Sequence, residues 1–135
     1  MRKILVGFDG SEPARHALEK AAELARLSGG TITVLTAAAD RLVREDGVVT
    51  MAADEDAGME VAESGADYLR SLGLEAVQAR VSVGAPDDAL VLEAGDGYDL
   101  VVVGHRSHGP LEELFVGSTA KSVVDRACCT VMVVR

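Results

Sequence analysis

Aromatic side chains are scarce in this sequence. Its 135 residues include two Phe, two Tyr and no Trp, although hydrophobic residues make up 48% of the chain. The core therefore has to be built mainly from Ala, Val and Leu, whose small volumes favour thin, closely packed layers. The same shortage leaves little surface on which the bases of a nucleic acid could stack.

Basic residues are also few. The chain has 13 Lys and Arg against 22 Asp and Glu, and its formal net charge is -9. This charge repels the phosphate backbone of nucleic acids and anionic membrane surfaces, so we expect neither as a partner. A small phosphorylated ligand remains compatible, because backbone N–H groups at a helix start bind phosphate without any basic side chain.

Long apolar runs are absent. No segment approaches the roughly 18 apolar residues that a membrane span needs. The apolar run at residues 4–7 directly follows residues 1–3 and is too short for the core of a signal peptide. We therefore expect a cytoplasmic protein, with one domain covering residues 1–135, since this length suits a single core.

Cysteine is represented by two adjacent residues, Cys128 and Cys129. Neighbouring cysteines cannot supply the C-x-x-C spacing of a metal site, and a disulfide between them would strain the backbone. We expect no metal site here, and two small side chains that are buried or half-buried in a reducing compartment.

The first part of the chain alternates between strand and helix signals. Residues 4–8 are a short apolar run that predicts a buried strand, and residues 9–11 predict a turn. Apolar residues with helical spacing then continue to Gly29, with Ser11 as the expected N-cap. The β-branched residues at 31–36 predict a second strand.

This pattern is lost from residue 37 to about residue 56, where acidic residues are scattered among apolar ones. We interpret this segment as a surface connection with room for a helical turn, and it could be either a lid over a site or an idle loop. Helical spacing returns over residues 57–72. Alternating apolar and polar residues at 77–83 then indicate a strand with one wet face, and hence an edge strand.

A third helix follows residues 84–86, a Gly-Ala-Pro turn. Asp87 and Asp88 fall in its first turn, where they complement the helix dipole, and it ends near Gly95. Residues 100–103 are apolar on both faces of a strand, which predicts a central position in the sheet.

The last two elements are a helix over residues 118–127, with Val123 and Val124 facing inward, and a strand over Thr130–Val134. If this short apolar strand lies at a sheet edge, it leaves backbone groups that a second copy of the chain can pair with. We therefore predict a homodimer through the strand Thr130–Val134.

Strands and helices in this order predict a doubly wound α/β domain, with an open five-stranded parallel sheet, helices on both faces and right-handed crossovers. With the first and fourth strands central, the strand order is 3-2-1-4-5. The topological switch then falls between strands 1 and 4, and ligands of such sheets bind beyond the strand ends at that point. Two loops meet there, residues 7–11 and the loop that begins at Gly104.

The second of these loops, residues 104–119, is the best candidate site. Gly104 lets the chain turn sharply after its strand, and the N–H groups of residues 106–109 can form an anion-binding nest. Residues 117–119 open a helix whose free N–H groups and positive dipole end face the same space. This arrangement suits a phosphate group.

Each of these residues also has a plain structural interpretation. Gly104 and Gly117 could be turn glycines, and Ser118 could be an ordinary N-cap. Asp9 could bond to its own backbone in a turn, and His108 could be a solvated loop residue. The joint spacing and position of these residues, rather than any one of them, favour a site.

Three residues of this loop carry a resemblance to a known family. Gly104, Gly117 and Ser118 have the spacing found in ATP-binding members of the universal stress protein family, whose loop reads Gly, two residues, Gly, nine residues, Gly, and Ser or Thr. The chain is similar to that family along almost its whole length, from residues 3–11 to residues 129–133.

The resemblance implies a Rossmann-like fold of the adenine nucleotide alpha hydrolase type and a bound ATP or AMP, with or without Mg²⁺. It implies that Ser118 and Thr119 contact phosphate. It also implies that Gly7 and Asp9 border the ribose and the adenine, with Ala37 beside the base. The predicted site combines both loops, the end of strand 2 and the start of the last helix: Gly7, Asp9, Ala37, Gly104, His105, Arg106, Ser107, His108, Gly109, Gly117, Ser118, Thr119 and Ala120.

Two departures from the family pattern affect the expected phosphate site. Ser107 stands where the family has its second Gly, so the N–H is kept, but a Cβ takes up space and a positive φ becomes costly. Glu112 and Glu113 stand where many members carry basic residues, which makes the local field less favourable to a triphosphate. His105, Arg106 and His108 act in the opposite direction.

Three functions fit these features. The first is a regulatory module that binds ATP or AMP in the stress response and is not an enzyme. The second is a nucleotide-independent dimer that acts through protein contacts. The third is a weak ATPase or phosphotransferase, although the sequence has no G-x-x-x-x-G-K-[ST] loop and no kinase-type pair of base and metal ligands. Asp9 alone could hold Mg²⁺ through water.

Overall fold

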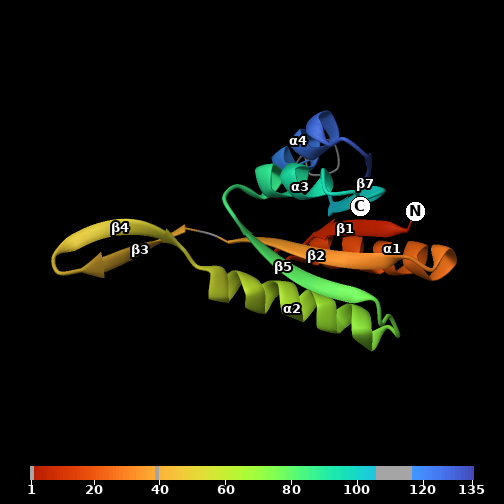
Figure 1. Ribbon diagram of the computed structural model, residues 1–135, viewed down its shortest axis with the longest axis horizontal. Helices are drawn as coiled ribbons and strands as arrows, with labels where there is room; N and C mark the ends of the chain where they lie inside the picture. The colour runs from red at the N-terminus through yellow and green to blue at the C-terminus, as the bar shows by residue number, and fades with distance from the viewer. Residues whose placement is uncertain (1, 39, 106–116) are drawn as a thin grey trace.

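The computed structural model describes residues 2–38, 40–105 and 117–135, and Figure 1 shows how its elements are arranged. In chain order they are β1 (Lys3–Gly7), α1 (Glu12–Ser28), β2 (Thr31–Ala38), β3 (Asp40–Glu45), β4 (Val48–Ala53), α2 (Glu55–Ser71), β5 (Val77–Val83), α3 (Pro86–Ala94), β6 (Leu100–Gly104), α4 (Ser118–Arg126) and β7 (Thr130–Val134). The predicted alternation of strands and helices is confirmed, and β3 and β4 are additional.

A five-stranded parallel sheet with the order β5-β2-β1-β6-β7 forms the centre of the fold. Numbered among themselves, these strands follow the order 3-2-1-4-5, so the predicted order and the edge position of β5 are confirmed. In the middle of the sheet Ile4 of β1 lies opposite Leu100 of β6, and Val6 lies opposite Val102. The carboxyl ends of β1 and β6 are therefore neighbours, which places the topological switch between them.

Helices cover both faces of this sheet (Figure 1). On one face α1 and α2 bury side chains such as Leu18 and Leu69 against the strands. On the other face α3 and α4 bury side chains such as Leu90 and Val123. The predicted doubly wound α/β architecture is confirmed.

Small residues let the helices lie close to the sheet. Gly65 of α2 is an example, because a Cβ there would lie 2.9 Å from the Phe8 ring and 3.1 Å from a methyl group of Val34. The contact face of α1 is largely alanine, with Ala14, Ala17, Ala21, Ala22 and Ala25 all buried. The thin, aliphatic layers expected from the composition are thus observed.

The ends of α1 are formed by the residues that the sequence predicts. The Ser11 hydroxyl accepts a hydrogen bond from the Ala14 N–H at 3.3 Å, as an N-cap does. Gly29 ends the helix in the left-handed region at φ 71°, where its N–H donates to the Ala25 carbonyl. This N-cap fixes the first turn of α1 beside the end of β1.

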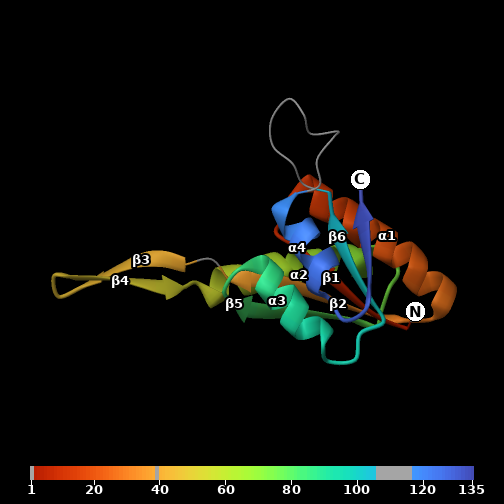
Figure 2. The same cartoon turned by 90° about the horizontal axis from the view of Figure 1, so that it is seen from above.

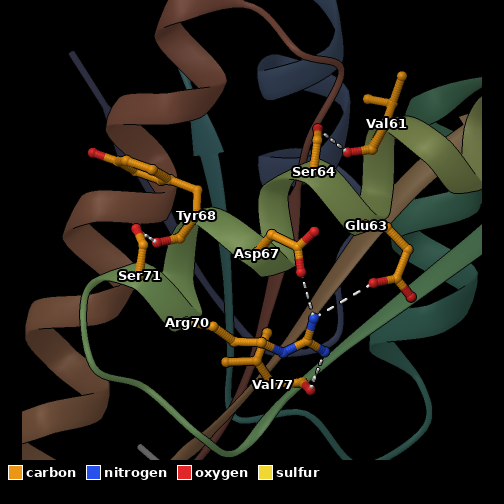
Figure 3. Close-up of polar contacts among 8 residues, drawn as sticks. All are labelled: Val61, Glu63, Ser64, Asp67, Tyr68, Arg70, Ser71 and Val77. Atoms are coloured by element: carbon orange, nitrogen blue, oxygen red, sulfur yellow. Dashed lines mark hydrogen bonds and ion pairs between the residues drawn. The ribbon is translucent and has the colours of Figure 1, made fainter.

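A hydrogen-bonded arginine joins the end of α2 to the start of β5 (Figure 3). Arg70 donates to the Asp67 carboxylate at 2.9 Å and to the Val77 carbonyl at 3.3 Å, and its guanidinium lies 3.5 Å from Glu63. These groups are solvent-exposed, so each ion pair contributes little to stability. Their role is to orient the chain as it enters the edge strand.

The connection between β2 and α2 differs from the prediction. β2 extends to Ala38, and β3 and β4 then form an antiparallel hairpin in which Leu42 lies opposite Met51. Asp46 and Gly47 make its two-residue turn, with φ of 50° and 77°. Positive φ at both positions is the type I′ turn that Asp-Gly favours. The segment lies on the surface, as predicted, but it forms a hairpin and no helical turn, because this turn and its β-branched neighbours outweigh the lack of a clear period.

Two side chains near the carboxyl terminus lie differently from the prediction. Val124 is 51% exposed rather than inward-facing, because it follows the buried Val123 on α4 and so points away from the sheet. Cys128 is exposed, while Cys129 is half-buried as expected. Burial raises the pKa of the Cys129 thiol above its usual value.

The described residues contain no group of three or more His, Cys, Asp and Glu side chains that could hold a metal ion. In the same part of the chain, no helix is long and apolar enough to cross a bilayer. The cytoplasmic location stays a prediction.

Candidate functional site

A cavity of about 510 Å³ opens at the carboxyl edge of the sheet, beside the ends of β1 and β6. Its described lining comes from β1, β2 and β6, the loops that follow β1 and precede α4, and the first turns of α1, α3 and α4. The lining residues are Gly7, Phe8, Asp9, Ser11, Pro13, Ala14, Leu35, Ala37, Pro86, Ala89, Leu90, Val103, Gly104, Gly117, Ser118, Thr119 and Ala120. A cavity of this size accommodates a nucleotide-sized ligand.

The structure brings most of the predicted site residues together in this cavity. Both predicted loops contribute, together with the end of β2 and the start of α4: Gly7, Asp9, Ala37, Gly104, Gly117, Ser118, Thr119 and Ala120. His105 lies next to Gly104 but is not among the lining residues, and its N–H donates to the Val134 carbonyl. The predictions for Arg106, Ser107, His108 and Gly109 fall outside the described residues.

Gly104 is required by a close approach between β6 and α1. A Cβ at this position would lie 2.5 Å from the carbonyl carbon of Pro13 and 2.9 Å from the nitrogen of Ala14. Real Cβ atoms are not found so close to backbone, so one of the two segments would have to move. The glycine therefore does more than allow a turn, because it lets the first turn of α1 form one wall of the cavity.

At the amino end of α4, the first three backbone N–H groups have no partner within the helix, and their residues line the cavity. Gly117 is the N-cap, with φ −60° and ψ 155°, and it has no side chain to cap the helix. The first intrahelical hydrogen bond runs from the Lys121 N–H to the Gly117 carbonyl, so the N–H groups of residues 118–120 precede it. Interpreting Ser118 as an ordinary N-cap is therefore wrong. These N–H groups and the positive end of the helix dipole form an anion-binding site.

Asp9 is the only charged residue among the described lining residues. Its Oδ1 accepts a hydrogen bond from the Ser11 N–H at 2.9 Å, so the predicted turn interaction is confirmed. This interaction holds the carboxylate at the end of β1, on the border of the cavity. A hydroxyl group of a ligand is the kind of donor that such a carboxylate can accept from.

One wall of the cavity is apolar, and none of its residues was part of the predicted site. Leu35 and Val103 come from the strands, and Pro86, Ala89 and Leu90 come from α3. The sequence held a usable signal for the α3 residues, because the first turn after any parallel strand lies at the carboxyl edge of the sheet. Apolar surface of this kind suits the flat face of a base.

The two helices that flank the cavity on this face are joined by one arginine. Arg126 of α4 donates to the Asp87 carboxylate at 3.1 Å and to the Asp88 carboxylate at 2.9 Å, both in the first turn of α3. A hydrogen bond from Ser122 holds the pKa of the Asp87 carboxyl below its usual value. Asp87 and Asp88 thus do more than complement the α3 dipole, since they also keep α3 and α4 in register around the cavity.

The described cavity offers few ligands for the Mg²⁺ ion that the resemblance allows. Asp9 supplies the only carboxylate among the described lining residues. Mg²⁺ usually keeps several waters and takes its other ligands from one or two carboxylates and substrate phosphates. The described residues therefore fit a Mg²⁺ ion that arrives with a nucleotide, and they do not fit a resident metal.

Sequence comparison shows relatives along the full length of this chain. The model of the Universal stress protein family matches residues 1–135. A universal stress protein of Thermus aquaticus is 31% identical over 139 residues, which cover 99% of this chain and 98% of that protein. The universal stress protein YxiE of Bacillus subtilis is 27% identical over 145 residues, covering 98% of each chain.

Solved structures with the same fold lead to the same family. UspA of Lactobacillus plantarum superimposes with a TM-score of 0.77 at 25% identity, covering 99% of this chain and 97% of that one. The universal stress protein of Archaeoglobus fulgidus in complex with dAMP has a TM-score of 0.74 at 25% identity, covering 100% and 98%. With its whole length matched in both sequence and fold, the chain belongs to the universal stress protein family.

Proposed function

We propose that this protein is a regulatory module of the stress response that binds an adenine nucleotide, ATP or AMP, in the cavity at the end of β1 and β6. The observation that carries the proposal is the start of α4, which has no side-chain cap and whose residues 118–120 line a cavity with an apolar wall. A phosphate and a base need these two environments side by side. The related Archaeoglobus protein, solved with dAMP, supports the same ligand class.

In this proposal, each part of the nucleotide contacts a different wall of the cavity. The phosphate accepts hydrogen bonds from the start of α4, where Ser118 and Thr119 add hydroxyl donors. The Asp9 carboxylate accepts from a ribose hydroxyl. The base lies between Ala37 and the apolar surface of Leu90. With a triphosphate, Asp9 would be the residue to hold a Mg²⁺ ion that arrives with the nucleotide, and the ion would neutralise phosphate charge.

Binding without catalysis is part of the proposal. Asp9 is the one titratable side chain among the described lining residues, and its carboxylate already accepts from the Ser11 N–H. Hydrolysis or phosphoryl transfer needs a group that orients the nucleophile as well as groups that neutralise the phosphates. The weak ATPase and the nucleotide-independent dimer remain the competing functions.

Calorimetric titration of nucleotide-free protein with AMP and with ATP plus Mg²⁺ tests the proposal. We expect saturable binding of one nucleotide per chain for at least one of the two, and no phosphate release from ATP. Mass spectrometry of the small molecules released on denaturation provides an independent check. No heat with either nucleotide, and no adenine nucleotide released, would support the nucleotide-independent function instead.

We also propose that the chain forms a homodimer through β7. The Val134 carbonyl accepts from His105 at the end of β6, so by alternation the backbone groups of Val133 point away from β6. Light scattering should give at least twice the chain mass of 14.1 kDa. Val133→Pro removes an outward N–H without removing a bond to β6, and we expect it to lower the measured mass. An unchanged mass would rule out pairing through this edge.

A further inference from the structure

The β3–β4 hairpin projects from the end of the molecule, beyond the start of α2 (Figures 1 and 2). Among the described elements, β3 and β4 pack extensively only against each other. A two-stranded hairpin is marginally stable in water by itself, and stable sheets usually have three or more strands or a helix packed on them. Within one chain, the described structure does not supply such a neighbour.

Large apolar side chains are exposed on this hairpin. Leu42 is 64% exposed, Met51 60% and Val49 53%. Leu42 on β3 lies opposite Met51 on β4. Val49 is two residues before Met51 on β4, so its side chain points to the same face as those of Leu42 and Met51. Exposed apolar side chains that are gathered together, rather than scattered singly, mark an interaction surface.

The charges of the hairpin are confined to one strand and the turn. They are Asp40, Arg41, Arg44, Glu45 and Asp46, whereas β4 (Val48–Ala53) has the uncharged sequence Val-Val-Thr-Met-Ala-Ala. Charged side chains on an edge strand prevent pairing with another chain. The outer edge of β3 is therefore protected, and the outer edge of β4 is open.

The turn determines which backbone groups β4 offers. A two-residue turn joins Glu45 to Val48, so this pair is hydrogen-bonded and the pairs alternate from there. The N–H and C=O groups of Val49, Met51 and Ala53 consequently point away from β3. Antiparallel pairing needs such a series of outward donors and acceptors.

We infer that β4 pairs antiparallel with β4 of a second copy of this chain, about a two-fold axis, to form a four-stranded sheet from two hairpins. Two paired hairpins make four strands, more than the three that a stable sheet usually needs. When β4 pairs antiparallel with its own copy about a two-fold axis, the same backbone N–H and C=O groups form hydrogen bonds on both chains. Each chain has a net charge of -9, so two copies approach with least repulsion along a strand without charges. The hairpin continues from β2, away from β7 at the far edge of the sheet, so this interface is separate from the proposed β7 dimer.

Light scattering on chains that carry Val133→Pro isolates the hairpin interface from β7. In this background we expect a mass of twice 14.1 kDa, and adding Met51→Lys should lower it to 14.1 kDa. Leu42→Lys is the matched control, because it makes the same change on the same face directly opposite Met51, but on β3. It should leave the dimer intact. Circular dichroism confirms that each variant is folded.

Three results would overturn the inference. A monomer in the Val133→Pro background, at the highest soluble concentration, would show that the hairpin has no self-association. Equal disruption by Leu42→Lys and Met51→Lys would assign the contact to the apolar face rather than to the β4 edge. If the chains associate but the Val49 and Met51 N–H groups are not protected from hydrogen exchange, pairing through β4 is excluded.

The salt dependence of the association distinguishes pairing with a second acidic copy from an interface held by opposite charges. Because two acidic copies repel each other, added salt should strengthen this association. A weakening with salt would indicate an ion-paired interface and would contradict pairing through uncharged β4.

Discussion

Replacing Ser118 with aspartate is expected to weaken AMP binding roughly fivefold or more while leaving the protein as stable as before. The new carboxylate would lie at the start of α4, within about 4 Å of the proposed phosphate position, where two like charges cost about 1 to 4 kcal/mol. Ser118 is solvent-exposed, so the substitution disturbs no core. An acidic residue in the first turn of a helix is itself favourable, which separates lost binding from lost folding.

Ser64→Asp is the control for this charge change. Ser64 is exposed on α2, where its hydroxyl donates to the Val61 carbonyl at 2.6 Å (Figure 3), and it is not among the cavity-lining residues. It alters the net charge by the same amount as Ser118→Asp. Calorimetry should therefore show wild-type affinity for AMP. If Ser118→Asp bound AMP as tightly as Ser64→Asp, the phosphate would not lie at the start of α4.

A Gly104→Ala substitution is expected to lower the free energy of unfolding by about 1–3 kcal/mol, the usual range for overpacking. The added methyl would lie 2.5 Å from the Pro13 carbonyl carbon, which is backbone and cannot change its rotamer to relieve the contact. The end of β6 or the first turn of α1 must move, and both line the cavity. Nucleotide affinity should consequently fall as well.

Gly95→Ala is the matched control for urea unfolding. Gly95 has φ −67°, which alanine adopts readily, and a Cβ there would lie 3.4 Å from the nearest atom, the Leu92 carbonyl oxygen. We expect unchanged stability, or a gain of up to about 1 kcal/mol from the restricted unfolded chain. A Gly104→Ala variant within about 0.5 kcal/mol of the wild type would show that the two segments separate without cost.

The sheet order could be predicted because hydrophobic periodicity is a local property that reflects burial. Residues 100–103 are apolar on both faces and became a central strand, while the alternation at 77–83 marked an edge. Once those positions are known, the right-handed crossover rule leaves few orders. The site position followed from the same reasoning, since it depends on where the order reverses.

The hairpin was not predictable from periodicity, because its strands face solvent on both sides. Val48 and Val49 are consecutive and both more than half exposed, so no alternation separates an inner from an outer face. The Asp46-Gly47 turn was the available signal. A turn motif in a segment that lacks a period deserves more weight than the missing period.

The sequence by itself determined the strands of the main sheet with their helices, the strand order and the two loops that meet at the switch point, because these depend on residue patterns within single segments. The tertiary structure alone decided why Gly104 has to be glycine and which apolar side chains of α3 complete the cavity. It also decided that Gly117, not Ser118, caps α4 and so leaves the N–H groups of residues 118–120 open. These features depend on distances between segments that are far apart in the chain, and no local pattern encodes such distances.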